Sequence, residues 1–226
     1  MNNSEYIADI FSENGAFEKA QQVSSDTVET YRSKLPDLLL EIWKQHGVGS
    51  WYNGLYRLCM PDDFKGLLSQ VFHADDDFSH NDCHVIAYSA FGNLVVWSER
   101  HGFVEISLLR GELTCNDLLH PEKKTGSSIS LTSEFYMLSE KSSLEAHNIY
   151  DEADKPLFAR ARKRLGDLEP GECYGFFPAL AMGGAPRLEN LKRTKALEHF
   201  LFLAQLQQFT LMDYLSRPIR AVRMIG

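Results

Sequence analysis

The fold of this chain depends on residues 84–115, HVIAYSAFGNLVVWSERHGFVEISLLRGELTC. It contains three clear runs of β-branched and aromatic side chains and a weaker fourth, the composition that is typical of strands. Turn signals separate the runs at Gly92-Asn93, His101-Gly102 and Arg110-Gly111. Connections this short join neighbouring antiparallel strands. The stretch therefore predicts an antiparallel β-meander.

Amphipathic segments before the meander predict helices that cover it, because a sheet with one apolar face needs a partner layer. The clearest is LPDLLLEIWKQHG, residues 35–47, in which apolar side chains recur at helical spacing and Gly47 supplies a stop. Shorter helices are expected before Gly15, after Ser25-Asp26 and from Pro61 to Phe72. Between the last two, residues 50–60 predict a strand broken at Asn53-Gly54.

The residues after the meander predict a helix-rich C-terminal part. Residues 116–128 are polar and mark the expected boundary between parts 1–120 and 121–226. The expected elements are helices over 131–148 and 152–165, a strand over ECYGFFPAL, a short strand over 188–193 and a helix capped by Thr194 that runs to about Gln208. No element is predicted beyond it. The predicted fold class is α+β: an antiparallel β-meander covered by helices, with a helix-rich C-terminal part.

Composition narrows the classes of function. The 226 residues carry a formal charge of −8, with 44% hydrophobic and 24% charged side chains, as in folded proteins. Binding of nucleic acid through its phosphates needs a clustered excess of Lys and Arg, which is absent, so no nucleic-acid partner is expected. The charge is compatible with a basic protein partner.

Sequence signals of compartment point to the cytoplasm. The N-terminal residues lack the basic and apolar regions of a signal peptide, and no apolar run approaches the roughly 20 residues that span a bilayer. We therefore expect a cytoplasmic protein without a membrane partner. The four cysteines form no CxxC pair and are interpreted as buried thiols.

Motifs for catalysis are missing from the sequence. It contains no GxSxG, HExxH, GxGxxG or P-loop spacing, and Glu169 and Glu172 have no apparent apolar pocket to tune them as an acid and a base. The densest polar stretch is HADDDFSHNDCH, residues 73–84, whose spacing matches no established metal site. We expect no cofactor, no metal and no enzyme activity. Residues 73–84 are interpreted first as a solvated connection, second as a binding surface for a basic partner, and last as a metal site.

Two stretches resemble a known family. Residues 35–64 and 85–113 resemble the GAD-like domain of bacterial immunity proteins, through LPDLLLEIWKQHGVG and GNLVVW, although Asn93 replaces the aspartate of the family pattern. LGDLEPGECYGFFPALAMGG, residues 165–184, followed by the helix signal of 188–206, is similar to the C-terminal region of type VI secretion immunity proteins. The two resemblances occur in the family's order and cover nearly the whole chain.

The resemblance implies a cytosolic immunity protein, or antitoxin, that binds a cognate secreted toxin; the best-known members neutralise DNases. No motif assigns the contact residues. Excess carboxylate motivates one hypothesis for the toxin-binding surface, which comprises Asp75, Asp76, Asp77, Asp82, Glu169 and Glu172. The alternatives are an intracellular scaffold or regulatory binding module of the same fold and, third, a small-molecule enzyme with a deep pocket and a perturbed acid or base.

Overall fold

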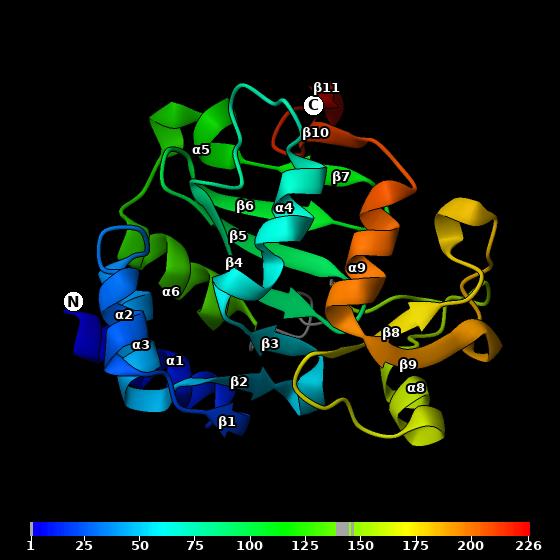
Figure 1. The fold of residues 1–226 in the computed structure, drawn as a ribbon, viewed down its shortest axis with the longest axis horizontal. Coiled ribbons are helices and arrows are strands. Elements are labelled where there is room, and N and C mark those ends of the chain that lie inside the picture. Colours follow the sequence, from blue (N-terminus) through cyan, green and yellow to red (C-terminus); the bar gives the residue numbers. More distant parts are fainter. Residues whose placement is uncertain (1, 139–144, 146) are drawn as a thin grey trace.

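A nine-stranded sheet runs through the molecule and carries helices on both faces (Figure 1). The computed structural model describes residues 2–138, 145 and 147–226. The strand order is β1-β2-β3-β4-β5-β6-β7-β10-β11, and a separate two-stranded sheet pairs β8 with β9. Neighbouring strands are antiparallel throughout, except that β10 runs parallel to β7. The predicted α+β class with an antiparallel meander is confirmed.

The predicted N-terminal elements occur in the predicted order, whereas strand β1, Glu18–Gln21, was not predicted. Asn2 and Glu5 form a capping box at the start of α1, and Gly15 ends it. Pro36 precedes α3, and Gly47 ends it with a positive φ of 74°. The bounds are α1 Asn3–Asn14, β1 Glu18–Gln21, α2 Ser25–Thr30, α3 Asp37–His46, β2 Val48–Trp51, β3 Tyr56–Leu58 and α4 Lys65–Val71, with 3-10 turns at Tyr52–Gly54 and Pro61–Phe64.

The meander consists of β4 Cys83–Ser89, β5 Asn93–Ser98, β6 Gly102–Ser107 and β7 Glu112–Thr114. Successive residues of β5 point to opposite faces of the sheet, as the strand period requires. Leu94 and Val96 pack in the hydrophobic cluster that contains Phe64, Leu67 and Phe200, whereas Val95 packs in the cluster on the other face. The meander is therefore buried on both faces over much of its length.

The C-terminal part corrects several sequence predictions. The helix expected over 152–165 begins at Phe158, because residues 151–154 form a turn held by backbone bonds to the Asp151 carboxylate. Thr194 lies within β9 and does not cap α9. Of the helix expected over 131–148, residues 139–144 and 146 lie outside the described residues. The bounds are α5 Asn116–Leu119, a 3-10 turn at Pro121–Lys123, α6 Ser127–Met137, α8 Phe158–Leu165, β8 Glu172–Phe176, 3-10 turns at Leu180–Met182 and Leu188–Asn190, β9 Leu191–Lys195, α9 Ala196–Gln205, β10 Phe209–Asp213 and β11 Arg220–Ile225.

Strands β10 and β11 were not expected from the sequence. They form because β7 offers a free edge, on which Thr210 and Leu211 pair with Glu112 and Leu113. Strands from both sides of residue 120 thus lie in one sheet. Among the described residues, none of the helices has the length and apolar composition that crossing a bilayer requires.

Three hydrophobic clusters fill the molecule. Helices α4 and α9 cover one face of the sheet and stand in front of it in Figure 1. Helices α1, α3 and α6 cover the other face around the fully buried Trp43 and Trp51. The third cluster lies between α8, the β8–β9 sheet and Phe91. The four cysteines are buried free thiols, as predicted.

Candidate functional site

The predicted acidic surface starts with Asp75, which the structure uses as an internal anchor. Its side chain is 1% exposed and accepts hydrogen bonds from Nη1 and Nη2 of Arg223 in β11. The bond from Nη2 to Oδ1 is 3.0 Å long. The backbone N–H groups of Asp77, Phe78 and Gly226 donate to the same carboxylate. Burial by itself would raise the pKa of Asp75, but these donors outweigh it and hold the pKa at about 2. Asp75 therefore ties the 73–82 segment to the last strand.

The other three aspartates of this segment differ in availability. Asp77 lies 2.6 Å from Arg223 Nη2, and Asp82 lies 2.6 Å from Arg100 Nε. Asp76 is exposed, and its carboxylate forms no ion pair with a described residue. Only Asp76 among the four thus offers a free charge to a partner.

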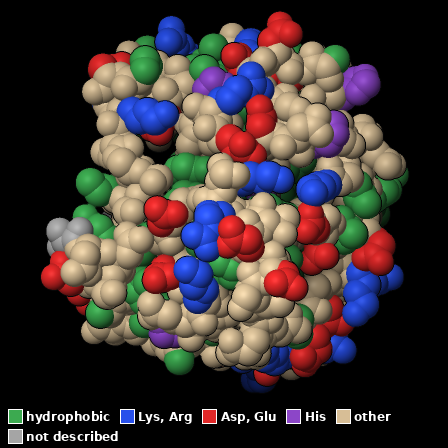
Figure 2. All heavy atoms as spheres, turned by 60° about the vertical axis from the view of Figure 1, so that its left-hand side comes forward, with side chains coloured by type: hydrophobic (Ala, Val, Ile, Leu, Met, Phe, Trp, Pro, Cys, Tyr) green, Lys and Arg blue, Asp and Glu red, His purple; other side chains and the backbone are tan. Residues whose placement is uncertain are grey.

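Glu169 and Glu172 lie at the opposite edge of the sheet from Asp75. Glu169 Oε1 is 2.9 Å from Lys19 Nζ in β1, the first strand of the sheet, whereas Asp75 contacts β11, the last. Glu172 lies 3.4 Å from Arg193 Nε and 3.8 Å from Lys195 Nζ. The structure therefore does not bring the six predicted residues together into one surface. Figure 2 shows the same interspersion of acidic and basic side chains on the face it presents.

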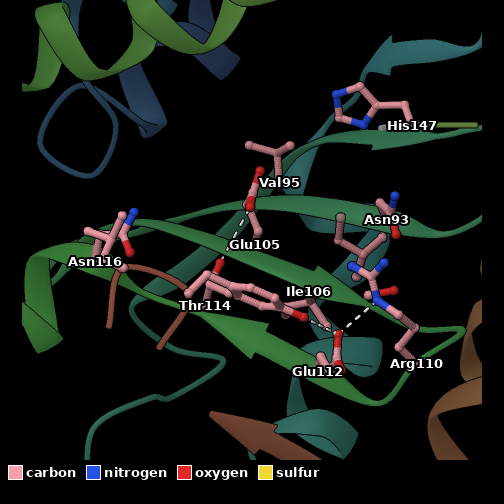
Figure 3. Close-up of a pocket in the computed structure, with 13 residues that line it drawn as sticks. Asn93, Val95, Glu105, Ile106, Arg110, Glu112, Thr114, Asn116 and His147 are labelled. Carbon is pink, nitrogen blue, oxygen red and sulfur yellow. Dashed lines mark hydrogen bonds and ion pairs between the residues drawn. The ribbon is translucent and has the colours of Figure 1, made fainter. Parts of the chain in front are cut away.

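A groove that the sequence did not predict lies over β5, β6 and β7 (Figure 3). Its walls are α6 and the 214–219 loop between β10 and β11. Two lobes, of about 300 and 420 Å³, share Glu105, Thr114, Asn116 and Leu215. Val95, Glu105 and Thr114 are cross-strand neighbours on one face of the sheet. Glu105 therefore lies where the apolar side chains of that face, such as Val95, end and the groove begins.

The loop that forms one wall of the groove is fixed by Asp213 at the end of β10. This carboxylate is 1% exposed and accepts from His120 Nε2 at 3.0 Å and from the backbone N–H groups of Leu215 and Ser216. The bond from His120 and these backbone donors hold the pKa of Asp213 at about 2. The hydrogen bonds that Asp213 accepts therefore hold this wall of the groove in place.

Two glutamates face each other across the groove, Glu105 from β6 and Glu134 from α6. Thr114 Oγ1 donates to Glu105 at 3.4 Å, and the hydroxyl of the fully buried Tyr56 donates to Glu134 at 3.4 Å, both long and weak bonds. Neither glutamate forms an ion pair with a described residue. Burial and then the charge of Glu105 raise the pKa of Glu134 to about 8, and burial raises the pKa of Glu105, which still reaches solvent through the mouth of the groove. The negative charge of Glu105 therefore opposes ionisation of Glu134, so the titrations of the two carboxyl groups are linked.

Among the other polar groups of the groove, the Arg110 guanidinium acts to lower the pKa of Glu105, but burial outweighs it. Burial lowers the pKa of His147 to about 4, so its imidazole, 5.2 Å from the Tyr56 ring, is neutral at physiological pH. Arg110 is bonded to Glu112, whose carboxylate also accepts the Tyr214 hydroxyl at 2.7 Å. Figure 3 shows the Arg110–Glu112 contact among the residues that line the groove. Among the described residues, no group of three or more His, Cys, Asp or Glu side chains converges to hold a metal.

This arrangement can exchange a proton or attract a positive charge, and little in the sequence predicts it. Glu105 stands inside the strand run FVEISLL, where alternation places it on one face without saying what that face meets. Its neighbour Glu134 belongs to a helix whose position over β6 is a tertiary result. A charged residue in the middle of an apolar strand was the single usable signal.

Comparisons with known proteins agree with the two resemblances. Residues 5–110 match the family model of the GAD-like domain, and residues 132–207 match that of the T6SS immunity protein Tdi1, C-terminal. The fold is similar to the crystal structure of Atu4351 from Agrobacterium tumefaciens, with a TM-score of 0.88 and 27% identity over 96% of this chain and 97% of that one. No match was found among curated proteins.

Proposed function

We propose that this chain, which belongs to the T6SS immunity proteins that join a GAD-like domain to a Tdi1 C-terminal domain, binds and neutralises a cognate secreted toxin. The observation that carries the proposal is the match of residues 132–207 to an immunity protein, in the same chain and after the GAD-like match. The similarity to Atu4351 over nearly the full length of both chains supports one continuous architecture.

Neutralisation requires binding and no catalysis. Hydrophobic clusters pack on both faces of the sheet. A surface that such a packed core holds in place before binding lowers the ordering cost of association. A protein of net charge −8 is drawn to a basic partner and orients it on approach. We propose that the toxin is a DNase, since an enzyme that grips DNA carries clustered Lys and Arg, and that the encounter takes place in the cytoplasm. The protein would then block access to the toxin's active site.

Asp76 is the proposed toxin contact within the 73–82 segment. It is exposed and unpaired among the described residues, whereas Asp75, Asp77 and Asp82 hold the segment in place through Arg223 and Arg100. Glu169 and Glu172 are proposed as a second, separate contact, weakened by their pairing with Lys19, Arg193 and Lys195.

Coexpression with a candidate secreted toxin, sought among the genes that neighbour this one, tests the proposal. We expect the wild-type protein to restore growth and to prevent loss of plasmid DNA. Asp76→Lys should reduce protection, because it reverses a free charge, and Glu189→Lys, at an exposed site in the turn before β9, is the matched control. Growth arrest despite abundant folded protein would contradict neutralisation. Protection without any effect on DNA from the toxin alone would contradict the DNase target and leave neutralisation standing. Equal protection by Asp76→Lys and wild type would reject the Asp76 contact.

A further inference from the structure

We infer that the groove over β5, β6 and β7 is a binding site for an organic cation, a guanidinium or primary ammonium group carried on an aliphatic stem. The inference stands on the cavity and the groups that line it, and it does not depend on the proposed function.

Negative charge gathers where the two lobes of the groove meet. Glu105 lines both lobes, and Glu134 faces it from α6. Other acidic groups of the fold have nearby cations: Glu112 is 2.8 Å from Arg110 Nε, and Asp213 is 3.0 Å from His120 Nε2. Glu105 and Glu134 instead lie close to each other without such a partner among the described residues. A cation placed between them would relieve their repulsion and bond to both.

The walls of the groove suit a stem of several methylene groups. Val95, Tyr214 and Leu215 line the lobe of about 300 Å³, a volume that matches small-ligand pockets. The Tyr214 hydroxyl is held by Glu112, so the aromatic side chain is fixed beside the path to Glu105. An apolar path that ends at two carboxylates favours a ligand with a hydrocarbon stem and a positive head.

Other ligand classes fit less well. An anion would meet two carboxylates, and the one guanidinium in this lobe, that of Arg110, is already bonded to Glu112. A divalent metal prefers three or more protein ligands, and no such group converges among the residues that the structure describes. A neutral ligand would leave the repulsion between Glu105 and Glu134 in place.

Binding should be linked to pH through the same two glutamates. The titratable and charged groups that face the pair are Tyr56, the neutral His147 and the Arg110–Glu112 pair, with Asp117 and Lys123 in the second lobe. The proton that Glu134 holds below its raised pKa of about 8 occupies the place where a cation would bind. We therefore expect affinity to rise about tenfold between about pH 6 and 9, as the proton leaves.

The test uses n-butylguanidinium as the probe and n-butylurea, its neutral analogue of similar shape, as the ligand control. Chemical-shift titration of the isotope-labelled wild-type protein should give a dissociation constant of about 1 mM or tighter for the cation. The urea should bind at least about tenfold more weakly, since it lacks the charge-assisted bonds. The shifts should centre on β5, β6, β7 and α6.

Variants connect the binding to the two carboxylates. Glu105→Gln and Glu134→Gln should each weaken n-butylguanidinium about tenfold or more and flatten the pH dependence, whereas the surface variant Glu189→Gln should bind as the wild type does. Native chemical shifts elsewhere in each variant establish that it is folded, and the comparison of cation with urea on the wild type stands without any variant. Equal binding of both probes, shifts that map outside the groove, or unchanged affinity in both folded glutamine variants would overturn the inference.

A second probe distinguishes the source of the cation. The blocked peptide acetyl-Gly-Arg-Gly-amide carries the same head group on a protein backbone. Binding of the peptide at the groove supports the side chain of a partner protein as the natural occupant. Binding of n-butylguanidinium alone supports a free small molecule, and binding of neither rejects the site.

Discussion

Replacing Asp75 with alanine should lower the free energy of unfolding by about 2 kcal/mol. The aspartate is 1% exposed and holds Arg223, so its removal leaves a guanidinium and three backbone N–H groups without their acceptor. The pKa of Asp75 is about 2 in the fold against 3.8 ordinarily. A gap of nearly two units corresponds to about 2.5 kcal/mol, since each unit is worth about 1.4 kcal/mol, and screening by water reduces this to about 2 kcal/mol. A fully buried pair would cost about 3–5 kcal/mol, but Arg223 is 35% exposed and water screens part of the loss.

The pH dependence carries the same sign. Because the folded state holds the pKa of Asp75 below its unfolded value, its contribution is complete above about pH 4 and disappears as the pH falls towards about 2. Urea unfolding followed by circular dichroism, at about pH 7 and about pH 3, measures both effects. Asp75→Asn should show the same loss at neutral pH and a smaller difference from wild type at the acidic end.

Asp76→Ala is the matched control, one residue away, exposed and unpaired among the described residues. It should change stability by no more than about 0.5 kcal/mol. If Asp75→Ala were as stable as Asp76→Ala at neutral pH, the link between the 73–82 segment and β11 would not contribute to the fold, and the reasoning would be wrong.

Three further results are expected. Gly47→Ala should destabilise the fold by about 2 kcal/mol or more in thermal unfolding, because a Cβ at φ 74° would lie 2.1 Å from Gln21 O. Gly15→Ala, at φ 75° with nothing within 4 Å of the added Cβ, should cost only about 1 kcal/mol in the same assay. Glu134→Gln should stabilise the protein by about 1 kcal/mol at about pH 8 and have little effect below about pH 4.5. The reason is that the fold raises the pKa of Glu134, so the wild-type protein loses stability as the pH rises. Glu189→Gln should show no such trend, and a pH-independent gain for Glu134→Gln would contradict the raised pKa. The four buried cysteines should resist Ellman's reagent in the native protein and react fully in urea, and rapid reaction of any one in the folded state would contradict its burial.

Local sequence patterns predicted most of the helices and strands. The apolar spacing of residues 38–43, with Pro36 before and Gly47 after, predicted α3 nearly to the residue. Turn signals likewise predicted β4 to β7. What failed was tertiary in origin: β11 is exposed and rich in arginine, and it is a strand because β10 pairs with β7 and presents its other edge.

The site was less accessible to sequence reasoning than the fold. Runs of carboxylates suggested a free acidic surface, but Asp75 meets Arg223 across 148 residues of chain, and Glu169 meets Lys19 across 150. No local pattern reports such partners. Glu105 and Glu134 went unnoticed for the same reason, since each is ordinary in its own segment and they become unusual only when α6 lies over β6.

Neutralisation is tested most directly by titrating this protein into the purified candidate toxin, inactivated for calorimetry and active for a parallel activity assay. We predict saturable binding with a dissociation constant of about 10 nM or tighter, together with loss of toxin activity at the molar ratio where binding saturates. Absence of binding heat and undiminished toxin activity, with both proteins folded, would contradict it.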